Sequence, residues 1–342
     1  MSKKYNGLTG LYNLGNTCYM NSCLQILLHT YELDECLRKL SLNDLKKIVD
    51  TDILIEWDNV RKNLWYKNTI FRPLKFVNVL HKVSIKKQNV NFSSFNQNDI
   101  SEFLLFLMEC FHNSISRKVI MNVSGLVTNS NDDLAKICFE MISNFYSNDY
   151  SEIICLFYAV QVSQIVSLDE KVVLSNKPEP FFILNLPIPN MKEPSIYDCF
   201  NLYTDYELLE GENSWLNEKT NTKEDVLKEI SFWSFPEILV IDIKRFNVSN
   251  NKNKVLVTFP LDELNLTDYV IGYNKDSYKY KLYAVCNHYG VALGGHYDCC
   301  IKVFNEKWYK FNDLEVTEIE NINSIISPYA YCLFYRKIKI IA

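Results

Sequence analysis

Cys18 occupies a position where a cysteine becomes a reactive nucleophile. It follows a Gly-Asn-Thr turn at residues 15–17 and opens a stretch in which apolar residues recur at helical spacing from Met20 to Leu28. A thiolate in the first turn of a helix faces unpaired N–H groups and the positive end of the helix dipole, which lowers the pKa of the thiol. Position therefore distinguishes Cys18 from the rest of the eleven cysteines, for which an inert buried side chain is the ordinary outcome.

His296 is the histidine best placed to act as a general base. It lies between a glycine pair, Gly294-Gly295, and an alternating segment that begins at Tyr297 and predicts a strand. Glycines at this point allow a mobile loop that approaches the cysteine closely. The histidines at 29, 81 and 112 fall on helical or surface stretches, where we expect packed or solvated side chains.

A hairpin downstream of His296 predicts the residue that orients its ring. Residues 304–307 indicate a turn between two strands, 297–303 and 308–311. A hairpin centred near Asn305 pairs residue 298 with 312 and residue 296 with 314. The side chain at 312 then lies on the same face as His296, one rung away.

Asn312 is therefore preferred over Asp313 as the orienting partner. The amide oxygen of Asn312 is expected to accept the Nδ1–H bond that selects the tautomer of the His296 ring. Asp313 is expected on the opposite face, hydrogen-bonded to the Gly294-Gly295 loop or to water. A bulge or a slip of one residue would exchange the two positions, so Asp313 stays an alternative third member.

Residues 10–25, with the sequence GLYNLGNTCYMNSCLQ, resemble the cysteine box of the ubiquitin-specific proteases. Further segments resemble the histidine box and the last strand of that family: 280–290, 294–297, 308–313 and 331–336. The resemblance covers about residues 7–336. It implies a papain-like triad in which Cys18 is the nucleophile, His296 the general base and Asn312 the third member.

The resemblance also assigns two residues outside the triad. Asn13, five residues before Cys18, is implied to be the side-chain donor to the oxyanion, whereas without the motif it would be an ordinary turn residue. A preorganised donor of this kind contributes about 3 kcal/mol to lowering the barrier. His288, in the upstream histidine position of the family, is implied to be structural.

Residues 97–104 resemble a third box, whose acidic residues contact the arginines of the ubiquitin tail. This implies substrate binding by Gln97, Asp99 and Glu102, together with Gly294, Gly295 and Tyr297 of the histidine box. Asp99 and Glu102 also have the spacing of a capping box at the start of an apolar-periodic helix, and both interpretations can hold together. The segment departs from the family pattern at Asn98 and Ser101, which affects the details of tail contact.

The order of the elements indicates an α+β fold. Helical periodicity dominates the first part of the chain, and short strand-like runs follow from about residue 181. No repeat or linker divides the chain, so a single catalytic domain is expected over residues 1–342. The family resemblance implies a papain-like fold with a helical thumb at about 7–145, and with fingers and an antiparallel-sheet palm at about 146–342.

The finger region is expected to lack the structural zinc that many family members bind. Such a site needs four thiolate or imidazole ligands, usually in close pairs, whereas Cys155 and Cys199 stand alone. Residues 215–218 (Trp-Leu-Asn-Glu) occupy the place of the second cysteine pair. We therefore expect no metal and no cofactor, and a finger region that is held together by packing.

Composition limits the partners and the compartment. The formal charge of -5 provides no basic field for nucleic acid, and no apolar stretch approaches the roughly 20 residues of a membrane span. Eleven cysteines without a secretory signal indicate reduced thiols. We expect a monomer in the cytoplasm or nucleus that binds neither nucleic acid nor a membrane.

The leading functional hypothesis is a thiol-dependent deubiquitinase that binds ubiquitin and ubiquitinated proteins. One alternative is the same chemistry on a ubiquitin-like modifier with a similar Gly-Gly tail. A second is a catalytically inactive module that binds ubiquitin. The presence of Cys18, His296 and Asn312 argues against inactivity, because a binding module has no need of an activated thiol.

Overall fold

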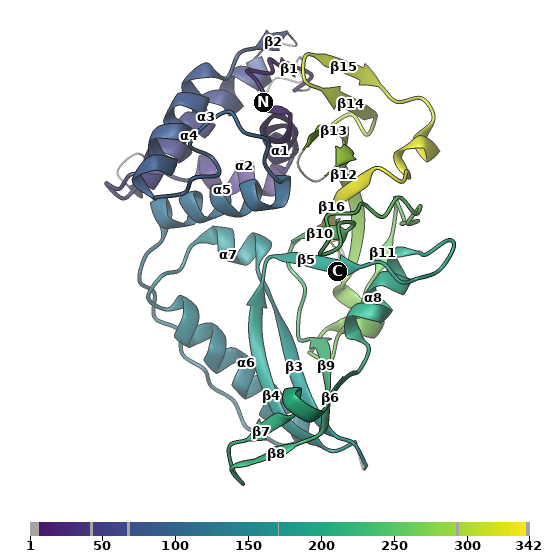
Figure 1. Cartoon of the computed structure of the whole chain (residues 1–342). Coiled ribbons are helices and arrows are strands. Elements are labelled where there is room, and N and C mark those ends of the chain that lie inside the picture. Colours follow the sequence, from purple (N-terminus) through teal and green to yellow (C-terminus); the bar gives the residue numbers. More distant parts are fainter. Residues whose placement is uncertain (1–6, 42–43, 67–68, 170, 292–293, 340–342) are drawn as a thin grey trace.

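Helix α1 (Cys18–Leu28) is buried along its whole length at the centre of a helical region, the thumb, at the upper left of Figure 1. Its sequence is apolar on nearly every side, which suits a helix enclosed by other elements. The structure is a computed structural model that describes residues 7–339 except 42–43, 67–68, 170 and 292–293. The other described elements of the thumb are β1 (Gly10–Leu11), α2 (Tyr31–Arg38), α3 (Asp50–Tyr66), β2 (Ile70–Phe71), α4 (Leu74–Lys86) and α5 (Ile100–Ile115).

The palm is a sheet whose strands run in the order β15-β14-β13-β12-β16-β10-β5, with β11 paired to β12. Its pairs are antiparallel, as expected, except β5 with β10, which run parallel. The strands are β5 (Ile183–Pro187), β10 (Ile238–Lys244), β11 (Leu264–Asn265), β12 (Lys279–Val291), β13 (Gly294–Lys302), β14 (Trp308–Asn312), β15 (Glu315–Glu318) and β16 (Ala330–Lys337).

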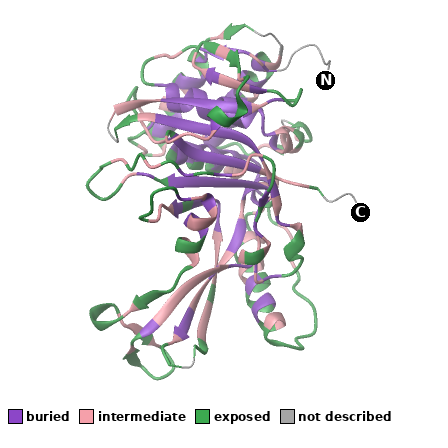
Figure 2. Cartoon of the chain, turned by 90° about the vertical axis from the view of Figure 1, so that its right-hand side faces the viewer, coloured by how far each residue is buried: buried purple, intermediate pink, exposed green. Residues whose placement is uncertain are grey.

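Both faces of the palm sheet are covered, which makes its central strands the most buried part of the molecule (Figure 2). One face packs on the thumb, where Cys286 and Cys299 join the core around α1. The other packs on α8 (Ile196–Thr204) and on the core around Phe200 and Leu333. The thumb therefore lies directly on the face of the sheet at strand β13, which carries His296.

The fingers extend from the palm as a second sheet, in the order β4-β3-β9-β6, with a small β7-β8 hairpin. Helix α6 (Ser130–Tyr146) covers this sheet, and Cys138 packs there with Val162 and Trp233. The helix therefore lies with the fingers, so the thumb ends earlier than the boundary expected near residue 145. The strands are β3 (Ala159–Ser167), β4 (Val173–Phe181), β6 (Glu207–Leu209), β7 (Trp215–Asn217), β8 (Thr222–Glu224) and β9 (Val226–Phe232).

The two finger cysteines lie on different helices. Cys155 is exposed on α7 (Glu152–Phe157), whereas Cys199 is buried in α8. No group of three potential metal ligands occurs among the described residues. No helix in the described part of the chain is long and apolar enough to cross a membrane.

Short 3-10 helices span Gly211–Asn213, Thr267–Tyr269, Lys275–Ser277 and Ile322–Ile325.

Candidate active site

Cys18 is the first residue of α1, as the sequence predicts, and its side chain is buried with 4% exposure. The turn before it is closed by Thr17, whose Oγ1 accepts a hydrogen bond from the Leu14 backbone N–H at 2.9 Å. Asn16 has φ 54°, a left-handed conformation that asparagine tolerates better than most residues. The local sequence thus delivers the thiol to the start of a buried helix.

The palm brings His296 to this thiol and Asn312 to the other side of the ring. The imidazole lies close to the Cys18 thiol, which is the largest influence on its pKa. The Asn312 Oδ1 atom accepts a hydrogen bond from Nε2–H of the ring at 2.6 Å. The β13–β14 ladder pairs Cys299 with Phe311 and Lys302 with Trp308, which is the register expected from the sequence.

The ring nitrogen that contacts Asn312 differs from the expectation of an Nδ1–H bond. The pairing of Cys299 with Phe311 places Asn312 one position beyond the end of this ladder, so His296 reaches Asn312 diagonally rather than straight across. Nε2, the ring nitrogen farther from the backbone, reaches Asn312 across this diagonal. Nδ1 is then left for the thiol of Cys18, which lies on α1 on the thumb side of the ring.

The surroundings of His296 favour its charged form. The interaction with Cys18 is the largest effect and raises the pKa of the imidazole to about 9, with further increases from Asn312 and from the charge of Asp313. Burial of the ring acts in the opposite direction. A proton is thus held on the ring at neutral pH, next to the sulfur atom.

Asp313 does not contact the ring or the glycine loop, and the expectation for it was wrong. Its Oδ2 accepts a hydrogen bond from Asn13 Nδ2 at 2.9 Å, and its Oδ1 accepts one from Asn21 Nδ2 at 2.7 Å. The backbone explains this, because Asp313 adopts φ 49° at the end of β14 and its carbonyl accepts from the Leu11 N–H. The carboxylate is thereby aimed at the thumb.

Asn13 is held at both ends of its amide. Its Oδ1 accepts from the backbone N–H groups of Gly15 and Thr17 at 3.0 and 3.1 Å, while Nδ2 donates to Asp313. These bonds leave one hydrogen of the amide group without an assigned acceptor. The residue is therefore fixed in the turn before Cys18 and keeps one donor available.

A cavity of about 210 Å³ lies beside Cys18. Five residues predicted to form the site line it: Cys18, Gln97, Asp99, Gly295 and Tyr297. Five others were not predicted to bind substrate: Tyr19, Asn98, Phe246, Asn250 and His288. Residues from the thumb, from the loop after β10 and from the β12–β13 hairpin therefore meet around one opening.

Asp99 both caps α5 and borders this cavity. Its Oδ1 accepts from the backbone N–H groups of Ser101 and Glu102, at 2.7 and 3.2 Å, and its Oδ2 accepts from the Tyr331 hydroxyl at 2.7 Å. Glu102 is exposed outside the cavity lining, and its carboxylate accepts from Asn91 at 3.4 Å. The capping interpretation thus holds for Asp99, while Glu102 does not line the cavity beside Cys18.

His288 supports the far wall of the cavity. Its ring packs against Phe246 and Tyr297, and Lys252 Nζ lies 3.0 Å from Nδ1 and donates to its backbone carbonyl at 2.6 Å. Burial, with the charges of Lys252 and His296, lowers the pKa of His288 to about 4. A neutral, packed imidazole agrees with the structural role implied by the resemblance.

Two further residues that support this site were not predicted, and only the first of them could have been found from the sequence. Asn21 lies three residues after Cys18 and therefore on the same face of α1, where its amide reaches Asp313. Lys252 lies in the loop at residues 250–254. Nothing local in the sequence indicates that this loop folds back onto β12.

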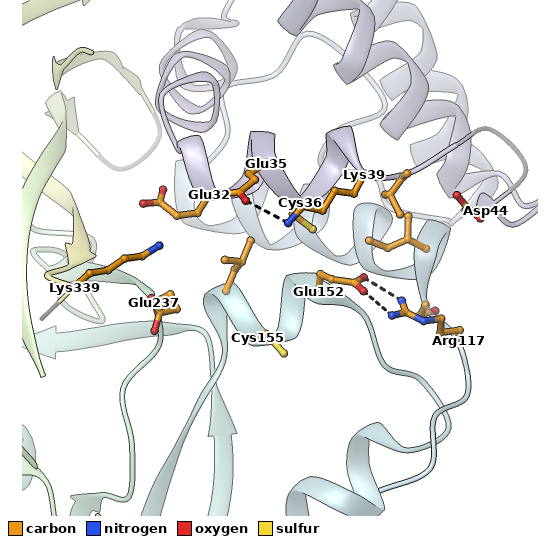
Figure 3. A pocket seen from close by; sticks show the side chains of 14 residues that line it. Glu32, Glu35, Cys36, Lys39, Asp44, Arg117, Glu152, Cys155, Glu237 and Lys339 are labelled. Atoms are coloured by element: carbon orange, nitrogen blue, oxygen red, sulfur yellow. Dashed lines mark hydrogen bonds and ion pairs between the residues drawn. The ribbon is translucent and has the colours of Figure 1, made fainter. Parts of the chain in front are cut away.

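A larger cavity, of about 610 Å³, lies between α2 and α7 (Figure 3), and neither Cys18 nor His296 lines it. Cys36 and Cys155 line it, with the ion pairs Glu35–Lys39 and Glu152–Arg117. Burial raises the pKa of Cys36 to about 11, and none of the described residues that line the cavity is a histidine. It lacks the pair that thiol catalysis needs, despite its size.

A buried thiol beside an imidazole, whose Nε2 atom is held by an amide, defines a papain-like cysteine peptidase site. The residues come from the thumb and from the palm, and they meet at the junction between the two. The chain matches the family described as ubiquitin carboxyl-terminal hydrolase over residues 9–335. It belongs to this family.

Relatives and solved structures agree with this assignment. Ubiquitin carboxyl-terminal hydrolase 2 of Homo sapiens is 32% identical over 349 residues, which cover 98% of this chain and 56% of that protein. The Gallus gallus protein of the same name is 33% identical, with coverage of 98% and 95%. The chain thus spans little more than half the length of several curated relatives.

A solved structure shares the fold. The "SAGA Ubp8/Sgf11/Sus1/Sgf73 DUB module bound to ubiquitin aldehyde" aligns with a TM-score of 0.75 at 23% identity, covering 99% of this chain and 71% of that chain. At this identity the likeness shows the fold alone. It agrees with the α+β, papain-like architecture.

Proposed function

We propose that the chain is a thiol-dependent deubiquitinase that hydrolyses the peptide or isopeptide bond after the C-terminal glycine of ubiquitin. The observation that carries this proposal is the contact of His296 with both Cys18 and Asn312, in a chain that belongs to the ubiquitin carboxyl-terminal hydrolase family. Cys18 is the nucleophile, His296 the acid–base group and Asn312 the residue that orients the ring.

The chemistry follows from the charges of this arrangement. The Cys18 sulfur attacks the carbonyl carbon of the terminal glycine, and the carbonyl electrons move onto the oxygen, to which Asn13 Nδ2 donates. The His296 imidazolium then protonates the leaving amine as the C–N bond breaks, which leaves a thioester on Cys18. The neutral imidazole next removes a proton from water, whose oxygen attacks the thioester carbonyl carbon. The C–S bond then breaks, which releases the ubiquitin carboxylate and restores the Cys18 thiolate beside the His296 imidazolium.

The cavity beside Cys18 is the proposed path of the substrate tail. Glycine residues have no side chains, so a narrow opening lined by Gly295, Gln97 and Tyr297 suits a tail that ends in Gly-Gly. Asp99 lies on the wall of this opening, and Glu102 lies further out, where basic residues of the tail would approach. Gly294 lies at the rim, and a Cβ atom there would be 3.8 Å from Gln97 Oε1.

The two alternative functions, an inactive ubiquitin-binding module and an enzyme that acts on a ubiquitin-like modifier, require different features of the site. An inactive ubiquitin-binding module has no use for an imidazole held between a thiol and an amide, so the geometry favours an enzyme. A ubiquitin-like modifier with the same terminal glycines would fit the same opening. Selection between modifiers rests on tail residues before the glycines and on the surface of the fingers.

We further propose that the protein acts as a monomer in a reducing compartment, the cytoplasm or the nucleus, without a metal or cofactor. The support is that all eleven cysteines are free thiols and most of them are buried. Such a set of thiols suits a reducing environment. The hydrolysis uses only side chains of the chain and water.

The deciding experiment is reaction with ubiquitin that carries a C-terminal electrophile, in parallel with ubiquitin-like modifiers bearing the same group. We expect a covalent adduct with ubiquitin that is lost in Cys18→Ala and kept in the matched control Cys155→Ala, which removes an exposed thiol elsewhere. Cys18→Ala should still bind ubiquitin, because the thiol adds little contact area. Labelling of Cys18→Ala, or a preference for another modifier, would contradict the proposal.

A further inference from the structure

Near the active site, strand β13 is paired with a neighbouring strand along only one of its two edges. Its pairing with β12 runs from Gly294 to Ile301, whereas its pairing with β14 covers only Cys299 to Lys302. In the described part of the chain, the segment before Cys299 is therefore paired on one side only. His296 lies in this half-paired segment.

The two residues before His296 are glycines, and the second has no room for a side chain. A Cβ atom on Gly295 would lie 2.2 Å from the Tyr289 carbonyl oxygen and 2.4 Å from Nε2 of His288. Close packing on His288 thus requires glycine at this point. Glycine also loses the most conformational freedom on ordering, so the backbone next to the general base needs other contacts to hold it.

Gln97 of the thumb supplies such a contact on the free edge. Its Oε1 atom accepts a hydrogen bond from the Gly295 backbone N–H at 2.7 Å. Its Nε2 donates to Asn16 Oδ1 at 3.4 Å, and the Asn16 amide in turn donates to the Phe95 carbonyl at 2.9 Å. One side chain thus joins the turn two residues before Cys18 to the strand one residue before His296.

Two other contacts of the described residues cross the cleft to this segment of β13, those of His296 with Cys18 and of Tyr297 with the Ile100 backbone, and neither is made by the glycine backbone. Asp313 meets Asn13 at the end of β14, and Tyr331 of β16 meets Asp99. Both contacts fix the thumb to the palm, but neither touches the glycine backbone that carries His296. Gln97 is therefore the thumb side chain that holds the glycine backbone next to His296.

We propose that Gln97 is a positioning residue for the reaction, which holds the strand end of His296 against the turn of Cys18 and so keeps the thiol and the imidazole within hydrogen-bond distance. This inference rests on the proposed function for its substrate but not for its geometry. It gives Gln97 a task in the free enzyme, in addition to the contact with substrate expected from the resemblance.

The first test measures the reactivity of the Cys18–His296 pair in the absence of ubiquitin. The rate of Cys18 alkylation by iodoacetamide, followed from pH 4 to 10 on the full chain, reports the thiolate that the neighbouring imidazolium stabilises. We expect Gln97→Ala to slow alkylation at pH 6 by about tenfold, because a lost hydrogen bond of ordinary strength allows the ring to move away. Gln97→Glu should restore most of the rate, since a carboxylate oxygen still accepts from Gly295 N–H.

Turnover of a ubiquitin substrate gives the second readout. Gln97→Ala should lower kcat by about tenfold and change KM by less than about twofold, as for a group that orders the catalytic pair. Asn96→Ala is the matched control, because Asn96 is an exposed amide of the same loop and makes none of these contacts. All variants should melt within a few degrees of the unsubstituted chain.

Each result that differs from the effects expected for Gln97→Ala has a single interpretation. A change confined to KM, with an unaltered alkylation profile, would make Gln97 a substrate contact only. Faster turnover of Gln97→Ala would show that the side chain obstructs the tail. Either result overturns the proposal. If ubiquitin is not a substrate at all, but alkylation still depends on Gln97, the proposed function fails while the positioning role stands.

Discussion

Asp313 accepts a hydrogen bond from Asn13 across the junction between palm and thumb, at 2.9 Å. The residue next to the orienting Asn312 thus controls the expected oxyanion donor, and not the imidazole. The side chains of Asn312 and Asp313 are adjacent at the end of β14 and point to opposite sides. One contacts His296 and the other contacts Asn13. Asn312 holds the ring, and Asp313 holds the Asn13 amide, which is the proposed donor to the substrate oxygen.

This relationship predicts that Asn13 and Asp313 act as a unit. Asn13→Ala should lower kcat by about a hundredfold with little change in KM, because the amide donates mainly in the transition state. Asp313→Ala should also lower kcat, since the Asn13 amide loses its anchor. Steady-state kinetics on the double variant should show a loss close to that of Asn13→Ala alone. A loss equal to the product of the two single effects would mean that they act independently.

Asn312→Ala should change the pH dependence as well as the rate. The bond from Asn312 helps to raise the pKa of His296 to about 9, so its removal should lower this pKa and move the alkaline limb of kcat/KM to lower pH. Asn312→Asp keeps an acceptor and should keep most of the activity. We expect Asn312→Ala to cost more activity than Asp313→Ala. The check is a pH–rate profile of each variant, with thermal melts to show equal folding.

Substitutions of Asp99 should separate its two roles. Asp99→Asn keeps a side-chain oxygen for the N-cap of α5 but removes the charge, so KM for ubiquitin should rise while stability changes little. Asp99→Ala should in addition lower the free energy of unfolding by about 1 kcal/mol. Denaturant unfolding and KM measured on both variants provide the comparison. If both variants lose stability and keep their KM, the residue is only a cap.

The buried carboxyl group of Asp242 leads us to expect that the stability of the fold depends on pH. Its carboxyl is buried in β10 beside Asp99 and accepts from the Ser101 hydroxyl at 2.7 Å, and burial raises its pKa from 3.8 to about 7. The folded state therefore holds a proton that the unfolded state releases between these values. This contribution to stability is present at low pH and is lost as the pH rises from about 4 to 7.

Asp242→Asn should remove this dependence, because the amide does not titrate and costs less to bury. Urea unfolding of both proteins at several pH values between 4 and 8 measures the difference. The variant should gain stability over the unsubstituted chain as the pH increases. Parallel pH curves for the two proteins would show that Asp242 keeps its ordinary pKa.

Local sequence was sufficient for the parts of this site that depend on short-range geometry. A turn followed by an apolar-periodic stretch places Cys18 at the start of a helix, because caps and periodicity act within a few residues. The hairpin register that relates His296 to Asn312 follows from the position of one turn and the alternation of a strand. The α+β order of the elements could be predicted for the same reason.

Only the tertiary structure decided what lies across the junction between thumb and palm. The partners of Asp313, the bridge from Gln97 to Gly295 and the fold-back of Lys252 onto His288 join segments that are distant in sequence. No local propensity encodes such contacts. They depend on how the thumb packs on the sheet, and on a left-handed residue at Asp313 that turns its carboxylate toward α1.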